Sequence, residues 1–118
     1  METYNIVQIE IRNGEYYYFY EFPPDLLVRN AGYIFLIIRK YPGEMNHDFL
    51  FIGTSYDLPK FLKKKEVLSF FEVNKATHIL TFRVDDEDEM AMMKEKLLEK
   101  YPSIKQELKP KRSKKVLT

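Results

Sequence analysis

The sequence predicts an α/β fold, in which helices flank a small, mainly antiparallel sheet of about five strands. Three observations predict this fold. Short segments rich in β-branched and aromatic residues alternate with turn signals, two strongly apolar runs occupy the centre of the chain, and segments with a helical spacing of apolar residues follow them. The chain has 118 residues, enough to bury a core, and residues 1–108 are expected to form a single domain.

An N-terminal β-hairpin is predicted over residues 4–22. Its first strand alternates in hydropathy and gathers apolar side chains on one face: Val7, Ile9 and Ile11. Asn13 and Gly14 then supply two residues that tolerate positive φ, which is a strong hairpin signal. The returning strand, residues 15–22, is rich in tyrosine. Because no lysine or arginine is interleaved in this run, we expect its rings to pack across the sheet rather than to stack on nucleobases.

Two apolar runs separated by a polar link predict the central hairpin of the sheet. Residues 33–38 are apolar at every position, which predicts a strand covered on both faces in the middle of the sheet. Residues 49–52 are equally apolar and are expected to lie beside it. The polar link contains His47, which is therefore expected on a loop, where a single histidine is usually solvated.

Two short helices are predicted after the second apolar run. Thr54 or Ser55 is expected to cap the first helix, because a hydroxyl oxygen can accept a hydrogen bond from the free backbone N–H groups of the first turn. This helix would turn its lysines towards solvent and its apolar side chains inward. The inward positions are Leu58, Phe61 and Leu62. Residues 66–73 predict the second helix.

A last strand and a longer helix are predicted towards the C-terminus. Residues 77–84 alternate in hydropathy, and His78 is expected to be buried or half-buried with the apolar side chains of this strand. The acidic run 85–89 is expected to begin a helix, since carboxylates offset the positive end of the helix dipole. It has no calcium-loop spacing with a turn glycine. One stripe of this helix is apolar: Met90, Met93, Leu97 and Tyr101.

Composition and motifs narrow the function classes. The chain contains no cysteine, which excludes disulfides and thiolate metal sites. It shows no phosphate loop, dinucleotide-binding fingerprint, nucleophile elbow or His-Glu-x-x-His motif. The sequence begins without a basic and apolar leader, and its longest apolar run is far shorter than the roughly 20 residues of a membrane-spanning helix. A cytoplasmic protein with no membrane partner is therefore expected.

Basic charge is concentrated near the C-terminus. Five of the 19 basic residues lie in residues 109–118, which contain no acid, so residues 1–108 carry 14 basic and 18 acidic residues. This tail, which includes Lys111 and Arg112, is expected to be disordered in isolation. A nucleic-acid-binding face on the remaining residues would have to be local, because their net charge is about −4.

The order of motifs over residues 31–104 resembles the GIY-YIG nuclease domain. Residues 51–58, Phe-Ile-Gly-Thr-Ser-Tyr-Asp-Leu, are similar to the Tyr-Ile-Gly-x-Ser-x-Asp-Leu of that family, and Ala31-Gly32-Tyr33 lies where its Gly-Ile-Tyr is expected. A helix, a strand, an acidic helix and a proline follow in the same order. The hairpin at residues 4–22 falls outside the resemblance, as an addition at the edge of the sheet.

The resemblance implies a site that hydrolyses phosphodiesters, with four chemical positions of which three differ here. In the family, two tyrosines, an arginine and a glutamate that holds one divalent metal surround the reacting phosphate. Tyr33 keeps the first tyrosine, but Phe51 lacks the second hydroxyl. Phe61 stands at the arginine position and Lys94 at the glutamate position. Loss of the phosphate-binding donor and of the metal ligand implies a catalytically degenerate site with no metal and no cofactor.

Three functions are consistent with these observations. The leading hypothesis is a degenerate nuclease-like module that binds nucleic acid or a protein partner. Its candidate nucleic-acid contacts are Lys60, Lys63, Lys64, Lys65, Lys111 and Arg112. The same lysines would also suit a solvated helix face. A second hypothesis is an active magnesium-dependent endonuclease with a relocated site, built from Tyr33, His47 or His78, and Glu95. The third is a structural protein, such as a homodimer formed through residues 15–22 if that strand lies at a sheet edge.

Overall fold

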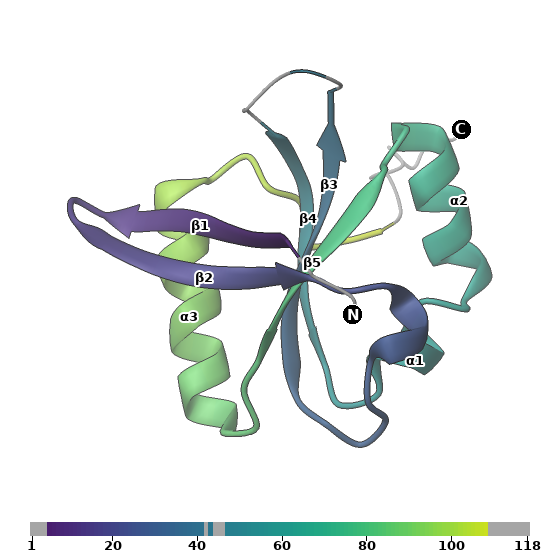
Figure 1. Cartoon of the computed structure of the whole chain (residues 1–118), viewed down its shortest axis with the longest axis horizontal. Helices are drawn as coiled ribbons and strands as arrows, with labels where there is room; N and C mark the ends of the chain where they lie inside the picture. The colour runs from purple at the N-terminus through teal and green to yellow at the C-terminus, as the bar shows by residue number, and fades with distance from the viewer. Residues whose placement is uncertain (1–4, 42, 44–46, 109–118) are drawn as a thin grey trace, which may run out of the picture.

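The computed structural model of the chain describes residues 5–41, 43 and 47–108 and has an α/β fold. Its elements in chain order are β1 (Asn5–Arg12), β2 (Glu15–Glu21), the 3₁₀ helix η1 (Pro24–Leu26), β3 (Tyr33–Lys40), β4 (His47–Ser55), α1 (Leu58–Phe61), α2 (Lys65–Asn74), β5 (His78–Arg83) and α3 (Glu87–Lys100). The strands form one curled antiparallel sheet that helices flank, as predicted (Figure 1). Within the described residues, no helix combines the length and the apolar character needed to cross a membrane.

The central strand of the sheet is β3, as its uniformly apolar sequence predicts. The strand order is β1-β2-β5-β3-β4, so that β3 pairs antiparallel with β4 on one side and with β5 on the other. Its residues 33–38 are at most 4% exposed to solvent. Burial on both faces removes the alternation of hydropathy that a half-exposed strand would show.

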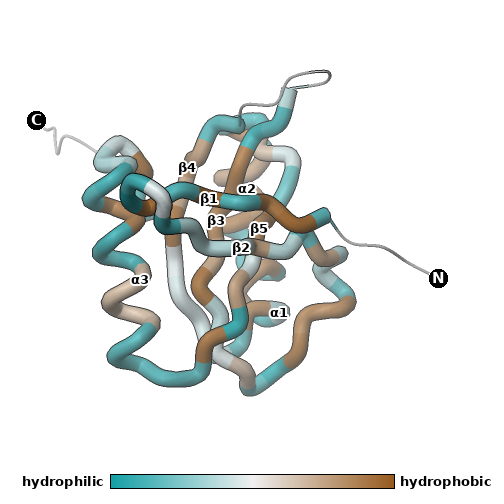
Figure 2. The backbone as a smooth tube through the Cα atoms, turned by 60° about the vertical axis from the view of Figure 1, so that its left-hand side comes forward, coloured by the Kyte–Doolittle hydropathy of each residue, from teal (hydrophilic) through white to brown (hydrophobic). Residues whose placement is uncertain are grey.

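Two apolar cores lie on opposite faces of this sheet. Ile34, Leu36 and Ile38 of β3 pack with the inward stripe of α3, whereas Tyr33, Phe35 and Ile37 pack with side chains of α1 and α2. Figure 1 shows α3 on one side of the sheet and the two shorter helices on the other. In Figure 2 hydrophobic residues gather in the central strands, and α3 is largely hydrophilic along its outer side. The fold is therefore a three-layer arrangement with the sheet in the middle.

The N-terminal hairpin forms as predicted, with Gly14 at φ +77° in its turn. The apolar face of β1 is buried at Ile9 and Ile11, and Phe19 of β2 is fully buried beside it. The ring of Phe82 lies 5.9 Å from that of Tyr17 and 5.7 Å from that of Phe19. Packing across the sheet is thus confirmed for the side chains that face α3. The alternate tyrosines of β2 point to the other face and are exposed.

The tyrosine-rich strand is not an edge strand. β2 lies between β1 and β5, and Tyr20 pairs with Thr81 of β5, so the outer strand on this side is β1. The premise of a homodimer through residues 15–22, an exposed sheet edge, is therefore wrong for the part of β2 that pairs with β5. The sequence could not show this, because the partner of β2 lies some sixty residues further along the chain.

The first helix is capped differently from the prediction. β4 continues through Ser55, so Thr54 and Ser55 are strand residues and the expected cap is wrong. Asp57 caps α1 instead, and its carboxylate accepts a hydrogen bond from the backbone N–H of Lys60 at 3.3 Å. The acidic run does begin α3, because Asp86 accepts from the backbone N–H of Glu89 at 2.8 Å and further acids fill the first turn.

The structure also differs from the prediction at the polar link and at the second apolar run. His47 is the first residue of β4 and pairs with Lys40, so its expected place on a loop is wrong. The pairing partner supplied by β3 extends the strand into residues that have little β propensity of their own. The edge of β4 away from β3 pairs with the segment after α3, where the backbone N–H of Ile52 donates to the backbone oxygen of Lys105 at 3.0 Å. The predicted tail at residues 109–118 lies outside the described residues.

Candidate functional site

Tyr33 stands at the start of β3 and is 4% exposed. Its hydroxyl oxygen accepts a hydrogen bond from the backbone N–H of Val28 at 3.1 Å. The guanidinium carbon of Arg83 lies 6.0 Å from the centre of its ring, on the neighbouring strand. The phenol is therefore tied to the loop that follows η1. It anchors that loop in the folded protein, and its oxygen is already engaged by a backbone donor.

The second and third positions of the resemblance lie in a closed aromatic cluster made of Phe35, Phe51, Phe61 and Phe70. Ring centres are 5.2 Å apart for Phe35 and Phe61, and 5.9 Å apart for Phe35 and Phe51. Phe51 also meets Phe70 of α2 edge-on at 5.7 Å. Where the family has a hydroxyl and a guanidinium, this chain therefore has rings that pack against one another.

The fourth position lies on a different layer of the molecule. Lys94 is on α3, next to Met93 and Leu97, whose side chains belong to the core on the opposite face of the sheet from the aromatic cluster. Glu95, the alternative metal ligand, is exposed on the same helix. The structure thus brings Tyr33, Phe51 and Phe61 to one face of the sheet, and places position 94 on the helix that covers the other face.

The residues of the relocated endonuclease site are not brought together. His47 pairs with Lys40 and His78 pairs with Ile38, at the end of β3 opposite to Tyr33. His78 is half-buried as predicted. Among the residues that the structure describes, no three His, Asp or Glu side chains gather in a group that could hold a metal ion.

The predicted lysine contacts form one exposed group, which we call the lysine cluster: Lys60, Lys63, Lys64 and Lys65. It spans α1, the link to α2 and the first residue of α2. Lys64 Nζ lies 5.6 Å from the centre of the Phe61 ring, so the cluster adjoins the aromatic cluster. Within the described part of the chain none of these four ammonium groups makes an ion pair. Lys111 and Arg112 lie outside the described residues.

A groove of about 1260 Å³ lies beside the lysine cluster, and sequence analysis did not predict it. Its lining is mostly apolar and includes Phe22, Leu62, Leu68 and Phe71. Charged side chains of both signs also line it: Glu21, Asp25, Arg29, Lys40 and Lys63. Within this lining, Glu21 Oε1 lies 3.4 Å from Lys40 Nζ, and Glu21 Oε2 lies 3.0 Å from His78 Nε2. These three groups come from three different strands, so no local sequence signal connects them.

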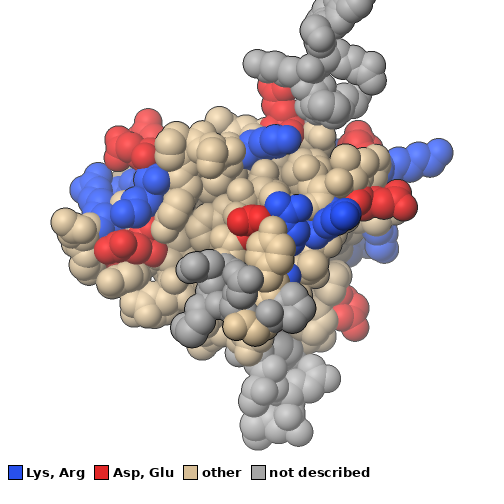
Figure 3. Space-filling view, turned by 90° about the horizontal axis from the view of Figure 1, so that it is seen from above, with Lys and Arg blue, Asp and Glu red and all other residues tan. Residues whose placement is uncertain are grey.

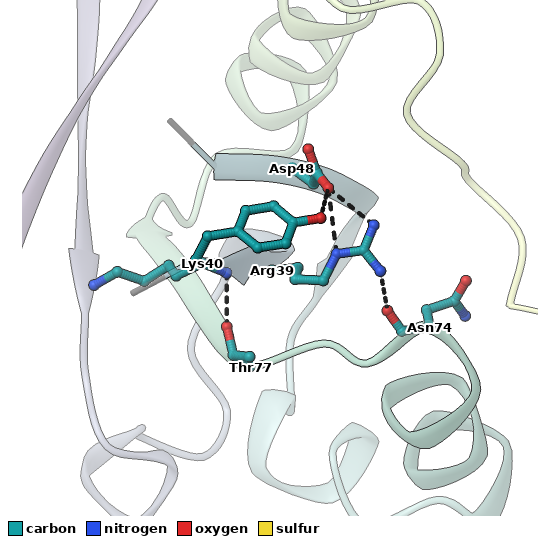
Figure 4. Close-up of polar contacts among 6 residues, drawn as sticks. Arg39, Lys40, Asp48, Asn74 and Thr77 are labelled. Carbon is teal, nitrogen blue, oxygen red and sulfur yellow. Dashed lines mark hydrogen bonds and ion pairs between the residues drawn. The ribbon is translucent and has the colours of Figure 1, made fainter. Parts of the chain in front are cut away.

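A second polar cluster joins α2 to the sheet (Figure 4). Arg39 donates to Asp48 Oδ2 through Nε at 3.2 Å and Nη2 at 2.9 Å, and to the backbone oxygen of Asn74 through Nη1 at 2.7 Å. The hydrogen bonds from Arg39 and then from the Tyr41 hydroxyl lower the pKa of the Asp48 carboxyl. All donors of this cluster are directed at groups of the protein itself, so it serves to hold the C-terminus of α2.

Asp85 is expected to make the fold sensitive to acid. The backbone N–H of Gly32, at 2.7 Å, and then the Arg83 side chain hold the pKa of the Asp85 carboxyl below its ordinary value. A lowered folded-state pKa contributes stability above the unfolded value of about 3.9, and that stability is lost as pH falls through the folded-state pKa. In urea titrations, the difference in unfolding free energy between wild type and Asp85→Asn should be widest near neutral pH and should close below about pH 4.

Asp25→Asn is the matched control for this prediction. Within the described residues its carboxylate accepts no hydrogen bond, although the substitution removes the same charge. It should show no comparable pH-dependent difference from wild type. A difference for Asp85→Asn that stays constant down to about pH 3 would contradict the assignment.

Comparison of this chain with protein-family models, with curated proteins and with solved structures found no match. The described residues offer cations on a surface next to a groove with apolar walls. They offer no gathered set of carboxylate ligands beside Tyr33. Such an arrangement is suited to binding a polyanion with apolar parts.

Proposed function

We propose that this chain is a catalytically degenerate, GIY-YIG nuclease-like module that binds nucleic acid. The observation that carries the proposal is the lysine cluster, which adjoins the aromatic cluster through the contact between Lys64 and Phe61. Elsewhere in the described chain, Arg39, Lys96 and Lys100 are paired with acids. Ammonium groups without acidic partners are free to contact phosphates and to release condensed counterions.

The order of elements supports the nuclease-like part of the proposal. β3, β4, α1, β5 and α3 occur in the same order as the motifs of the resemblance, with α2 between α1 and β5. Tyr33 and Phe51 lie in one apolar core, against which Phe61 packs. Phenyl rings at positions 51 and 61 cannot donate a hydrogen bond to a phosphate, and Lys94 at the fourth position cannot act as a ligand of a metal cation. Binding without hydrolysis is the function that survives these replacements.

Removing charge from the lysine cluster should weaken nucleic-acid binding and reduce its salt dependence. The variant Lys60→Gln/Lys63→Gln is expected to lower the slope of log affinity against log salt by about 1 to 2 units. The control Lys94→Gln/Lys105→Gln removes the same charge from distant positions and should change neither quantity by a comparable amount. Fluorescence anisotropy with a labelled single strand and a labelled duplex, at several salt concentrations, measures both.

Three outcomes would contradict the proposal. Equal effects of the two double variants would show that net charge, rather than the lysine cluster, governs binding. Magnesium-dependent cleavage that is lost in Tyr33→Phe would restore the active endonuclease. If no nucleic acid binds at all, a protein partner is left as the function of the module. A further variant, Lys111→Gln/Arg112→Gln, reports the share that belongs to the tail.

A further inference from the structure

One face of the hairpin is left open by the helices. Tyr20 of β2 pairs with Thr81, and Thr81 pairs with Phe35, so Tyr20 points to the face of the sheet on which the aromatic cluster lies. Alternation along the strand places Tyr16 and Tyr18 on the same face. Over β3 and β5 that face is covered by side chains of α1 and α2, whereas no helix among the described residues covers it over the hairpin. The three tyrosines, which we call the tyrosine stripe, are 41%, 51% and 39% exposed in chain order.

The rings of the tyrosine stripe are available to a ligand. Among the described residues the stripe makes one close ring contact, in which Tyr20 stacks on Phe22 with centres 5.4 Å apart and planes at 10°. Alternate residues of a strand are separated by about 6.6 to 6.8 Å, so the stripe is a row of regularly spaced, flat surfaces. A single strand can present successive bases to such a row, whereas the bases of a duplex are stacked inside it.

The aromatic row continues into the groove. Phe22, which stacks on Tyr20, also lines the groove. Two cations line it as well: Arg29, which lies 3.8 Å from Asp57, and Lys63, which belongs to the lysine cluster. Both surfaces lie on the same face of the sheet, since the lysine cluster belongs to α1 and to the start of α2. An aromatic row next to a line of cations is the arrangement by which proteins bind single strands, with bases on rings and phosphates on basic side chains.

The charges around the tyrosine stripe permit an anionic ligand. The two hairpin acids nearest the turn are paired with lysines of α3, since Glu15 lies 3.8 Å from Lys96 and Glu10 lies 3.6 Å from Lys100. Figure 3 shows basic and acidic side chains side by side at the end of the molecule where β1 and β2 turn. Arg83 lies two residues beyond Thr81 on β5, on the same face as the stripe, and its guanidinium pairs with Asp85 at 3.3 Å.

We propose that the tyrosine stripe is a stacking platform for a single-stranded nucleic acid, whose backbone passes along the groove to the lysine cluster. This inference rests on the proposed function and names the kind of nucleic acid and the second contact surface. It also revises the expectation from sequence. One face of the strand over residues 15–22 packs in the core, and its other face is exposed to a ligand. The strand itself contains no lysine or arginine, and other elements of the fold supply the cations.

The test compares variants that remove the rings with one that keeps them. Tyr16→Leu/Tyr18→Leu keeps apolar side chains on the strand but removes the stacking surfaces, and it should weaken binding to a labelled oligothymidine about tenfold or more. Tyr18→Phe keeps the ring and should bind like wild type. Tyr41→Leu removes a similarly exposed tyrosine at the far end of β3 and should also bind like wild type. Quenching of tyrosine fluorescence by the oligothymidine should accompany binding in wild type and shrink in the double variant.

The outcomes separate this inference from the proposed function. If binding depends on salt and on the lysine cluster but is unchanged in Tyr16→Leu/Tyr18→Leu, the stacking platform is overturned and the proposed function stands. A duplex bound as tightly as the single strand, with no effect of the tyrosines, likewise overturns the platform alone. If wild type binds no nucleic acid, the stacking platform and the proposed function are both overturned.

If the double variant changes only the oligomeric state in light scattering, the stripe is a contact between copies and the inference is overturned. Urea unfolding confirms that each variant is folded, and Tyr18→Leu alone serves if the double variant is not.

Discussion

Replacing Phe35 with alanine is expected to lower the free energy of unfolding by about 3 to 5 kcal/mol. Phe35 is fully buried on the central strand and touches the rings of Phe51 and Phe61. Truncation removes the apolar surface and leaves a cavity in a core whose neighbouring strands pair with β3 on both sides, which limits collapse around it. Urea unfolding followed by circular dichroism measures the loss. The midpoint should fall while the slope m stays constant.

Phe61→Ala is the control within the same aromatic cluster. Phe61 makes the ring contact with Phe35 from the other side, but it is half-buried on the short helix α1. Less of its surface leaves water on folding, so its truncation should destabilise by clearly less. Equal losses for the two variants would show that the cluster behaves as a surface patch and not as a core. A loss below about 1 kcal/mol for Phe35→Ala would do the same.

Sequence patterns that only a few backbone arrangements can satisfy correctly predicted the α/β class and the antiparallel sheet of five strands. An uninterrupted apolar run at residues 33–38 can lie only where both faces of a strand are covered, and β3 lies there. Asn13-Gly14 between two alternating segments has one common outcome, a tight hairpin, and Gly14 takes the positive φ that this requires. The acidic run before Met90 likewise begins a helix, because the dipole favours carboxylates at that end.

Features that depend on tertiary pairing were mispredicted or missed. His47 belongs to a polar segment with the composition of a loop. It nevertheless pairs with Lys40 of the neighbouring strand, and this pairing extends β4. The cap of α1 is Asp57 and not the predicted Thr54 or Ser55, because the strand pairing continues through position 55. Local propensity is weak compared with a free hydrogen-bonding edge beside the segment.

The candidate site also has one part that local sequence predicted and another that depends on tertiary pairing. The lysine cluster is contiguous in sequence and was predicted, and its exposure follows from its position on a short amphipathic segment. The groove and the tyrosine stripe depend on β2 lying beside β5, which brings together residues far apart in the chain. A tyrosine-rich strand gives no sign of which of its faces the helices will cover. That information comes only from the order of strands in the sheet.

Replacing Gly32 with alanine is expected to destabilise the fold by about 3 kcal/mol or more. A Cβ at this position would lie 2.2 Å from the backbone oxygen of Val84 and 3.1 Å from Cα of Asp85. Neither atom can move freely, because Val84 N–H donates to Gly32 O at 2.9 Å and Gly32 N–H donates to the Asp85 carboxylate at 2.7 Å. Accommodating one methyl group therefore means separating β3 from the segment that leads into α3. The measurement is the urea midpoint at neutral pH.

Gly14→Ala distinguishes this collision from the ordinary effect of losing a glycine. Gly14 has a positive φ but open space around its Cα, so alanine there should destabilise by only about 1 to 2 kcal/mol, from left-handed backbone strain. The two variants should also differ in their response to acid. If Gly32→Ala breaks the hydrogen bond to Asp85, that carboxyl loses the main cause of its lowered pKa and keeps only the contribution of Arg83. Adding Asp85→Asn to this variant should therefore alter the pH dependence by less than it does in wild type. Gly14→Ala leaves the bond intact and should keep the full difference. A Gly32→Ala protein that retains both its stability and that difference would show that the contact between Gly32 and Val84 is loose.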